Sequence, residues 1–514
     1  MNFYFRTNYN SEIGIGHYMR CYRLANFFKE RGHKCYIFVD RLNKNFLDSS
    51  MIKPLYKSSE NFKNETIDSK RFISQIKKLK NGYVIVDDYR IGHLWEKKID
   101  SYCKKIISID DFENRKHFTD IYINQKTKFL SEKHIDKNIF VKKNPLLLLG
   151  PDYSIIDKSE NRKKNDKFTI IFNFGGSGDL KHYDNILGEI RKYKITKIQY
   201  ILVIGPLSKN VNLVYKLKKI KNVKIVKNQI NLNRIYSKAH IFVGSAGTSV
   251  YETINNKLLS VIFQISDNQS NSIKSLEKIG HYFFLEHEDL KNKKKISRLL
   301  INLCKNYKVL KNLVFNADFK IDSDGKKRIL KSIISSNLKK KSISNNLKFI
   351  KKSGYNIRKV KIEDINDYLD SRNKPQNRKF SFNKDKIKRL DHYNWWFESK
   401  RSSFVLEKNN QVILYFYHYP VLLLNKKYYV SGWFVKDEKC SIQDILYALN
   451  WQRKLNIKMW LSTVKKNNKV ALRYNKYLGW NKLTENNRLS KEIKKKFIIK
   501  GFNFYLRNNY EKKL

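Results

Sequence analysis

The chain has 514 residues, of which 106 are lysine or arginine and 47 are aspartate or glutamate, a formal net charge of +59. This length predicts about three domains, each large enough to bury a core. Such a large positive charge suggests nucleic acid or an anionic membrane surface as a binding partner. The excess, however, is spread along the whole chain, without a zinc-finger spacing, an aromatic RNA-binding motif or a basic arm. We therefore expect no nucleic acid partner, although a nucleic-acid-binding protein stays as a remote alternative.

Cysteine usage and the N-terminus indicate a reduced, cytoplasmic protein. The five cysteines include no C-x-x-C pair, so neither a disulfide framework nor a metal site is expected. No basic-then-apolar signal segment opens the chain. The longest apolar run, Val412–Leu424, contains His418 and Pro420 and is too short to span a bilayer, so we expect no membrane insertion. The oligomeric state stays open.

Residues 1–150 alternate short apolar runs with helical stretches. Runs such as Val84–Val86 are typical of strands buried on both faces, which favours a parallel sheet and a Rossmann-like domain. One helix is expected near His17–Arg31. The predicted strands of this block are Asn2–Arg6, Lys34–Val39, Tyr83–Asp87, Lys105–Asp110 and Ile121–Asn124.

The alternation restarts over residues 151–335, which predicts a second Rossmann-like domain facing the first across a cleft. A Lys/Ser/Asn-rich stretch, residues 336–354, is expected to be a linker. The strands predicted for this second block are Phe168–Phe174, Gln199–Gly205, Val223–Val226, His240–Val243 and Ser260–Ile265.

Residues 355–506 have a different pattern, which predicts an α+β domain. The fold class expected for the whole chain is therefore α/β, two Rossmann-like domains followed by this α+β domain. Helices are expected at Ile362–Ser371 and Ser441–Leu455, with a last helix near Asn468–Leu478. An antiparallel series is expected at Ser403–Leu406, Val412–Tyr419 and Lys427–Val435, with a further strand at Lys458–Leu461.

A histidine follows the first predicted strand, in the sequence Gly14-Ile15-Gly16-His17. The carboxyl end of a parallel strand is where an open α/β sheet receives a ligand, and the amides that open the next helix favour anions. An imidazole with a pKa of about 6.5 can accept a proton from water there. The alternative is a capped helix with a surface histidine.

Two small-residue loops follow strands of the second block and could let backbone amides approach a phosphate. The first contains Gly175, Gly176 and Ser177, and the second contains Ser245, Gly247, Thr248 and Ser249. Glu252 could accept hydrogen bonds from ribose hydroxyls; the alternative is a tight turn with Glu252 in a capping box. Asn268 and Gln269 add amide side chains at the same sheet edge. The absence of a G-x-G-x-x-G fingerprint argues against a dinucleotide dehydrogenase.

Read together over residues 1–335, these segments resemble the PseG-type UDP-sugar hydrolases. The segments that carry the resemblance, in chain order, are Ile13–Cys21, Arg31–His33, Asp87–Tyr89, Asn124–Gln125, Gly150–Tyr153, Gly175–Ser177, Gly244–Glu252 and Asn268–Gln269. Those enzymes release UDP from UDP-2,4-diacetamido-2,4,6-trideoxy-β-L-altropyranose in pseudaminic acid biosynthesis, which supplies surface polysaccharides and flagellin glycosylation. They are related to GT-B glycosyltransferases, and a GT-B glycosyltransferase using a UDP-sugar donor is the alternative.

The resemblance implies a role for each matching residue. His17 is the base that activates water at the anomeric carbon, and Tyr89 lies near the sugar. The Ser245–Glu252 loop holds UDP, with Glu252 at the ribose, and no cofactor is needed. The positions implied on the substrate side are Gly14, Gly16, Arg20, Asn268 and Gln269.

The last domain has its own resemblance. Asn467–Trp480 is similar to the closing helix of GNAT acyltransferases, and the segment from Arg372 to Phe397 resembles the PseH-type N-acetyltransferases of the same pathway. This implies acetyl-coenzyme A as cofactor, a 4-amino UDP-sugar as acceptor, and Tyr474 as acid toward the leaving thiolate, with Asn467 beside it. The expected glycine turn for the coenzyme diphosphate is absent from Lys436–Ile442, so an active acetyltransferase and a degenerate module both stay open. Trp395–Phe397 is expected to be core.

Overall fold

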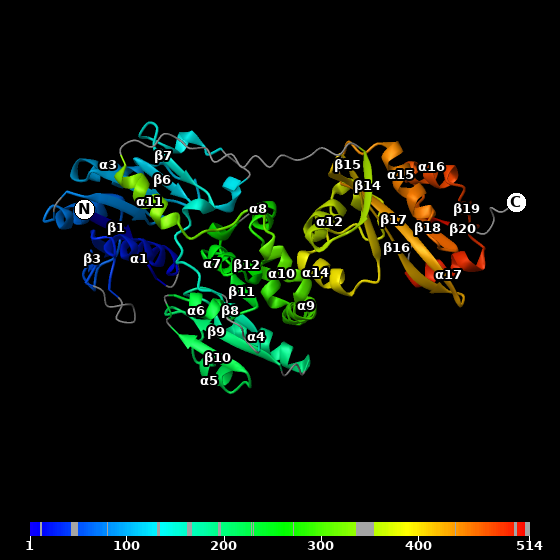
Figure 1. Cartoon of the computed structure of the whole chain (residues 1–514), viewed down its shortest axis with the longest axis horizontal. Coiled ribbons are helices and arrows are strands. Elements are labelled where there is room, and N and C mark those ends of the chain that lie inside the picture. Colours follow the sequence, from blue (N-terminus) through cyan, green and yellow to red (C-terminus); the bar gives the residue numbers. More distant parts are fainter. Residues whose placement is uncertain are drawn as a thin grey trace. The chain divides into compact units, whose positions relative to one another are not determined.

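The computed structural model describes residues 1–10, 13–42, 50–79, 81–130, 134–161, 167–193, 197–227, 229, 231–270, 272–335, 354–436, 438–497 and 501–508. It divides into two compact units, Met1–Lys341 and Ser342–Leu514 (Figure 1). Most of the predicted linker, residues 336–353, lies outside the described residues. Within the described ranges, no helix combines the length and apolar character needed to cross a bilayer.

The first sheet of the first unit has seven parallel strands in the order β3-β2-β1-β4-β5-β6-β7. Its order reverses between β1 and β4, which creates a switch point at the carboxyl ends of these two strands. The strands are β1 (Asn2–Thr7), β2 (Lys34–Val39), β3 (Ile52–Pro54), β4 (Tyr83–Asp87), β5 (Lys105–Ile109), β6 (Ile121–Asn124) and β7 (Leu146–Leu149), and the helices are α1 (Gly16–Lys29), α2 (Glu65–Ile76) and α3 (His93–Ile99). The two short strands at the sheet edges, β3 and β7, were not predicted from the sequence.

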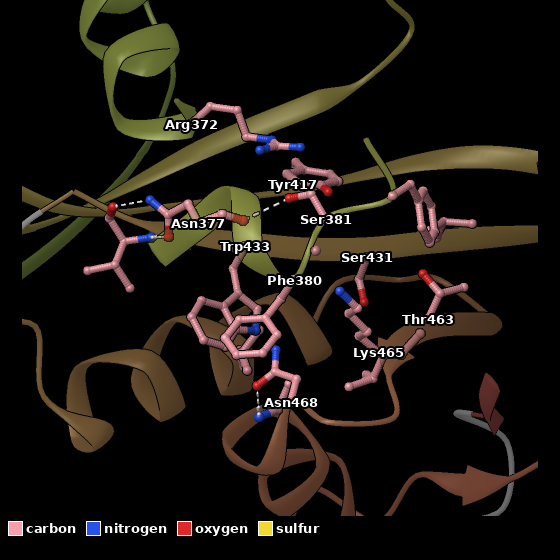
Figure 2. Close-up of a pocket in the computed structure, with 18 of the residues that line it drawn as sticks. Arg372, Asn377, Phe380, Ser381, Tyr417, Ser431, Trp433, Thr463, Lys465 and Asn468 are labelled. Atoms are coloured by element: carbon pink, nitrogen blue, oxygen red, sulfur yellow. Dashed lines mark hydrogen bonds between the residues drawn. The ribbon is translucent and has the colours of Figure 1, made fainter. Parts of the chain in front are cut away.

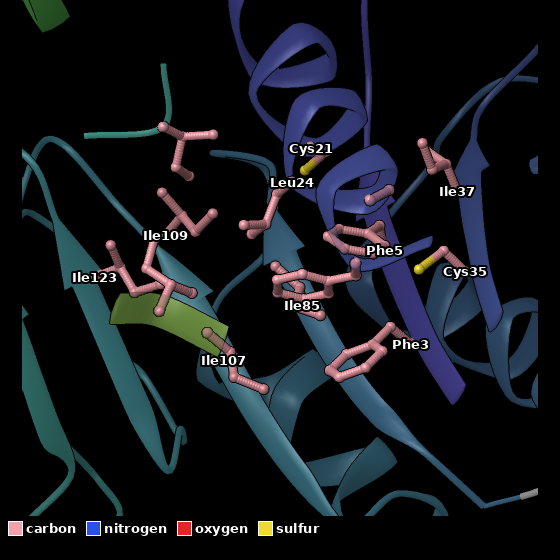
Figure 3. Packing of buried hydrophobic residues seen from close by; sticks show 14 of the residues in the cluster. Phe3, Phe5, Cys21, Leu24, Cys35, Ile37, Ile85, Ile107, Ile109 and Ile123 are labelled. Carbon is pink, nitrogen blue, oxygen red and sulfur yellow. The ribbon is translucent and has the colours of Figure 1, made fainter. Parts of the chain in front are cut away.

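The hydrophobic core beneath α1 includes side chains from the last helix of the unit. Phe3 and Phe5 of β1 pack with Leu24 of α1 against the isoleucines of β4, β5 and β6 (Figure 3). Ile329 and Ile333 of α11 (Gly325–Ile334) are fully buried in the same cluster. The helix that ends the second sequence block therefore returns to complete the core of the first.

The second sheet also has only parallel pairs, in the order β10-β9-β8-β11-β12-β13, with its switch point between β8 and β11. Its strands are β8 (Phe168–Asn173), β9 (Ile198–Ile204), β10 (Val223–Lys227), β11 (Ile241–Ser245), β12 (Leu259–Gln264) and β13 (Phe283–Glu286). Its helices are α4 (Leu180–Ile190), α5 (Leu213–Lys218), α6 (Asn233–Tyr236), α7 (Ser249–Asn255), α8 (Ile273–Lys278), α9 (Lys293–Lys305) and α10 (Tyr307–Phe315). Two parallel α/β sheets confirm the expected Rossmann-like fold class.

The second unit contains a mixed seven-stranded sheet in the order β14-β15-β16-β17-β18-β20-β19, which confirms the α+β prediction. Its strands are β14 (Tyr355–Lys359), β15 (Ser402–Lys408), β16 (Gln411–Leu423), β17 (Lys426–Val435), β18 (Met459–Lys465), β19 (Asn481–Lys482) and β20 (Phe502–Asn508). Its helices are α12 (Ile365–Arg372), α13 (Pro375–Lys379), α14 (Arg389–Glu398), α15 (Ile442–Arg453), α16 (Lys469–Tyr477) and α17 (Arg488–Phe497).

The expectation that the helix near Asn468–Leu478 is the last one is wrong. The helix α17 follows it and buries Leu489 and Ile493 beneath a lysine-rich face, and β20 then pairs antiparallel with β18. The apolar face of α17 has about one residue per turn among many lysines, so the sequence gives only a weak helical signal.

Candidate functional site

A cavity of about 1230 Å³ lies in the first unit, where the carboxyl ends of both parallel sheets meet. Its wall comes from the loops after β1, β4 and β5 and from those after β8, β9, β11 and β12. Every residue predicted for hydrolysis or UDP binding lines this one cavity: Gly14, Gly16, His17, Arg20, Tyr89, Gly175, Gly176, Ser177, Ser245, Gly247, Thr248, Ser249, Glu252, Asn268 and Gln269.

His17 forms a buried pair with Asp87. The imidazole stands in the first turn of α1 with 4% of its surface exposed, and its Nδ1 lies 2.6 Å from Oδ1 of Asp87, the last residue of β4. In the neutral ring, a carboxylate at this distance favours the tautomer that carries its proton on Nδ1 and its lone pair on Nε2. No described residue hydrogen-bonds to Nε2, and the ring lines the cavity. The arrangement is that of a general base oriented by a carboxylate.

Arg20 fixes the Asp87 carboxylate from one turn further along α1. Its Nε and Nη2 each donate to Asp87 at 2.7 Å, and its Nη1 donates to Asp111 at 2.8 Å. Burial alone would raise the pKa of Asp87, but the charges of Arg20 and His17 outweigh it and lower this pKa to about 2. Arg20 therefore uses its donors on carboxylates and acts here as a positioning residue.

Tyr89 completes the group around His17. Its ring packs edge to face against the imidazole of His17, with the two ring centroids 4.2 Å apart, and its hydroxyl donates to Asp111 at 2.8 Å. Burial raises the pKa of Tyr89, and the Asp111 charge raises it further, so the phenol stays protonated. Asn268, from the other half of the cavity, lies near this hydroxyl and partly offsets the rise in the pKa of Tyr89.

The glycine loops allow the two halves to approach closely. Gly14 has φ of +79°, and a Cβ at this position would lie 3.5 Å from Oγ of Ser177. A Cβ on Gly176 would lie 2.1 Å from Cγ1 of Ile15, which no side chain could tolerate without movement. With glycine at 176, the loop after β8 rests on the loop that presents His17 without displacing the Ile15 side chain.

The turn before α7 offers backbone donors to the cavity. The amides of Gly247, Thr248 and Ser249 have no acceptor among the described residues. Thr248, the N-cap, makes no side-chain capping bond, so the capping-box alternative for Glu252 is not what the structure has. The Glu252 carboxylate instead lies 2.5 Å from Nη1 of Arg23 on α1.

Asn268 and Gln269 lie after β12, at the same edge of the second sheet. Oε1 of Gln269 accepts from the amide of Ile265 at 3.0 Å, and Oδ1 of Asn268 accepts from the Ser266 hydroxyl at 2.6 Å. These bonds hold the oxygen of each side chain against its own loop. Each amide nitrogen is thereby directed away from that loop, and Nε2 of Gln269 lies next to Gly247.

Two carboxylates of this site, Asp87 and Asp111, were not predicted from the sequence as functional residues. Asp87 lies in the recognised Asp87–Tyr89 segment, but its pairing with His17 depends on the neighbouring positions of β1 and β4. Asp111 follows β5, one strand further from the switch point. A pair of consecutive aspartates at the carboxyl end of each of two adjacent parallel strands, Asp87-Asp88 and Asp110-Asp111, is a signal that could have indicated both.

The second unit has a cavity of about 690 Å³ at the point where β17 and β18 separate (Figure 2). These parallel strands pair only from Tyr429↔Trp460 to Ser431↔Ser462. Beyond the last pair, the Asn377 side chain bonds both backbone groups of Val435, at 2.7 and 3.1 Å. Since backbone groups two residues apart face the same side of a strand, those of Trp433 also point into this gap.

The two residues predicted for acetyl transfer do not line this cavity. Tyr474 is 5% exposed, packs against Trp433, and has a hydroxyl with no hydrogen-bond partner in the described part of the chain. Asn467 is exposed in the preceding turn. The next residue, Asn468, lines the cavity and caps α16 by accepting from the amide of Ala471 at 3.1 Å.

The start of α15, where the coenzyme diphosphate was expected, carries a negative charge of its own. Ser441 and Asp444 form a capping box, in which the amide of each residue donates to the side chain of the other. The Asp444 carboxylate also pairs with Lys408 at 3.1 Å and lies buried. These residues do not fit a bound diphosphate, because the carboxylate would repel it.

Trp395, expected to be core, faces the second cavity from α14.

No group of three or more His, Cys, Asp or Glu side chains in the described ranges is placed to hold a metal ion. The five cysteines are all free thiols.

No family model matches the chain. A curated relative, an uncharacterised protein of Methanocaldococcus jannaschii, is 23% identical over 422 residues, 76% of each chain. Solved structures that are similar include MurG of Acinetobacter baumannii (11% identity, TM-score 0.43, 65% of this chain and 99% of that one). A second is the UDP-GlcNAc 2-epimerase of Neisseria meningitidis bound to UDP-GlcNAc (11% identity, TM-score 0.42, 65% of this chain and 99% of that one). A third is an N-acetyltransferase of Staphylococcus aureus (14% identity, TM-score 0.23, 30% of this chain and 98% of that one).

Proposed function

We propose that the first unit is a nucleotide-sugar hydrolase that releases UDP from UDP-2,4-diacetamido-2,4,6-trideoxy-β-L-altropyranose or a close relative, in the synthesis of a pseudaminic-acid-type sugar. The observation that carries the proposal is the buried His17–Asp87 pair at the wall of a cavity built by both parallel sheets. The resemblance around His17 supports water rather than a sugar hydroxyl as the group that the base activates.

In this mechanism, Nε2 of His17 takes a proton from a water molecule while the oxygen of that water attacks the anomeric carbon. The new carbon–oxygen bond forms while the bond from that carbon to the diphosphate oxygen breaks, and UDP leaves with the bonding electron pair. Asp87 stabilises the imidazolium that forms, because the carboxylate already accepts from Nδ1. A base of this kind contributes ~10²–10⁴ in rate.

The second sheet supplies what the departing diphosphate needs. The unpaired amides before α7 would bind its oxygens, and Lys181, Lys209 and Lys291 line the same side of the cavity. Glu252, held by Arg23, would accept from the ribose hydroxyls. UDP is then a stable leaving group, so the site needs a positioned water and a base but no separate acid.

The alternative, a GT-B glycosyltransferase, differs in what attacks the anomeric carbon. The test is to incubate the purified chain with UDP-diacetamido sugars that differ in configuration, with no sugar acceptor present, and to measure free UDP. Hydrolysis predicts stoichiometric UDP and free sugar from one configuration. UDP that forms only after an acceptor is added would favour the transferase.

For the second unit, the resemblance of Asn467–Trp480 to the closing helix of GNAT acyltransferases supports a role in acetylating the 4-amino UDP-sugar that precedes the hydrolase substrate. The capping box at α15 does not fit the diphosphate of acetyl-coenzyme A, which argues against an active acetyltransferase. We expect the full chain to bind acetyl-coenzyme A weakly or not at all in calorimetry. Micromolar binding with acetyl transfer that is lost in Tyr474→Phe would instead establish a bifunctional enzyme.

A further inference from the structure

Two arginines of the second unit face its cavity without a carboxylate partner. Arg372 ends α12, and Arg401 directly precedes β15; both line the cavity. Nη1 of Arg372 is buried and has no hydrogen-bond partner among the described residues. Asp391 is the acidic residue of the cavity wall, and it forms no ion pair with either arginine. The guanidinium groups of Arg372 and Arg401 are therefore not neutralised by a carboxylate in the described part of the unit, and Arg453 and Lys465 add further basic side chains to the cavity wall.

Elsewhere in the same unit, a partly buried arginine is neutralised by carboxylates. Arg358 lies 2.7 Å from both Asp364 and Glu407. Burial lowers the pKa of Arg372, and the nearby charge of Arg401 lowers it further. A guanidinium nevertheless stays protonated in proteins. Keeping two such groups together out of water is costly unless an anion joins them.

Aromatic rings hold the arginines in place. The guanidinium carbon of Arg401 lies 3.9 Å from the centroid of the Tyr417 ring and 5.1 Å from that of Trp395. Tyr417 in turn lies across Gly432, where a Cβ would come within 2.5 Å of its hydroxyl oxygen. Figure 2 shows Arg372 next to Tyr417 at the same end of the cavity. A guanidinium stacked on a ring keeps its N–H edges free for a ligand in its plane.

The arginines occupy one side of the sheet, and the acetyl-transfer candidate occupies the other. Tyr415 and Tyr417 of β16 pack with Tyr368 and Trp395, whereas the alternate residues Leu414 and Phe416 pack with α15 and Tyr474. The cavity reaches both faces through the gap between β17 and β18. The arginine side is therefore distinct from the start of α15.

We propose that Arg372 and Arg401 bind the diphosphate group of a nucleotide, with Trp395 and Tyr417 forming the aromatic wall beside it. Two forked cations match the two or more negative charges of a diphosphate, and about 690 Å³ is enough for a nucleotide-sized ligand. A UDP-sugar and coenzyme A both carry this group. The inference does not depend on hydrolysis in the first unit.

The test is calorimetry of the full chain with UDP and, separately, with coenzyme A. We expect the wild-type chain to bind one more equivalent of UDP than the Arg372→Gln/Arg401→Gln double variant. The affinity at that site should fall about 100-fold. Arg473→Gln, which removes an exposed arginine from α16 of the same unit, should leave the stoichiometry unchanged.

The Arg372→Lys/Arg401→Lys variant keeps both charges but loses the forks, so it should fold and bind about tenfold more weakly than wild type. If only the coenzyme A titration changes, the diphosphate comes from the coenzyme; if only the UDP titration changes, it comes from a UDP-sugar. Unchanged binding of both ligands in a folded double variant would overturn the inference. UDP release by the first unit should be unaffected, so a failed hydrolase assay and a failed arginine site are separate results.

Discussion

Asp87 contacts two basic side chains in the site, the imidazole of His17 and the guanidinium of Arg20. The sequence indicated His17 because a titratable ring between glycines follows a predicted strand. It did not indicate the partner, since Asp87 lies 70 residues away and reaches His17 only because β1 and β4 are neighbours. Residue identity thus predicted a histidine at the cavity wall, and sheet order supplied the carboxylate that pairs with it.

We expect His17→Ala to lower the rate of UDP release by ~10²–10⁴, because it removes the only base proposed for the attacking water. UDP affinity should stay within a few-fold, since the proposed nucleotide contacts belong to the second sheet. Rates come from a free-UDP assay and affinities from calorimetry. His33→Ala, just beyond the end of the same helix and outside the cavity, should match wild type. Full turnover by His17→Ala would remove the histidine from the mechanism.

Asp87 should also make folding of the first unit sensitive to acid. Its pKa falls from 3.8 to about 2 in the folded chain, so its contribution is complete above about pH 4 and is lost as the pH falls to about 2. The shift corresponds to about 2 kcal/mol. Denaturant unfolding of wild type and Asp87→Asn should therefore differ by about 2 kcal/mol less at about pH 2 than at about pH 5. A constant difference would mean that the carboxylate is not stabilised by His17 and Arg20.

At the scale of elements, strands buried in the middle of each sheet could be predicted, because they form continuous apolar runs such as Val84–Val86. The edge strands β3, β7 and β13 were missed, as were the edge strands β14 and β19 of the second unit; β20, which lies between β18 and β19, was missed as well. An edge strand is short and has one neighbour, so its sequence carries less apolar signal. The glycine loops were recognised as phosphate-binding candidates, but their contact with each other across the cavity depends on tertiary structure.

The contact between the loops after β1 and β8 can be tested at Gly176. In Gly176→Ala the new methyl group would displace Ile15, two residues from His17, so we expect slower UDP release and a lower melting temperature. Gly188→Ala is the matched control, because its Cβ would meet no atom within 4 Å inside α4, and it should stabilise the chain by about 0.5–1 kcal/mol.

Shortening the opposing side chain provides the reverse test. Ile15→Ala combined with Gly176→Ala should recover part of the lost rate, since the smaller residue leaves room for the methyl group. Equal activity of Gly176→Ala and wild type would show that the two loops do not meet in solution.

At the scale of the molecule, the division into Met1–Lys341 and Ser342–Leu514 agrees with the change in sequence pattern near the predicted linker. The return of α11 to the first core was not predicted. The spacing of its apolar residues would suit packing on either sheet, so the sequence pattern alone does not show which sheet the helix covers. Ile329 and Ile333 are both fully buried there.

We expect a chain ending at Ser335 to fold and release UDP at the full-length rate, because it keeps both parallel sheets and α11. A chain ending at Asp324 lacks α11 and uncovers the core beneath α1, so its melting temperature should fall sharply. Burial of each isoleucine contributes about 1.5–3 kcal/mol. Thermal unfolding and UDP release of the two chains give the comparison. Inactivity of a folded chain ending at Ser335 would mean that catalysis needs the second unit.

The most direct test of the proposed reaction is a turnover in ¹⁸O-labelled water, with both products analysed by mass spectrometry. Attack of water on the anomeric carbon predicts one ¹⁸O atom in the released sugar and none in UDP, with incorporation lost in His17→Ala. Label in the phosphate of the nucleotide product, or an unlabelled sugar joined to an acceptor, would contradict the account.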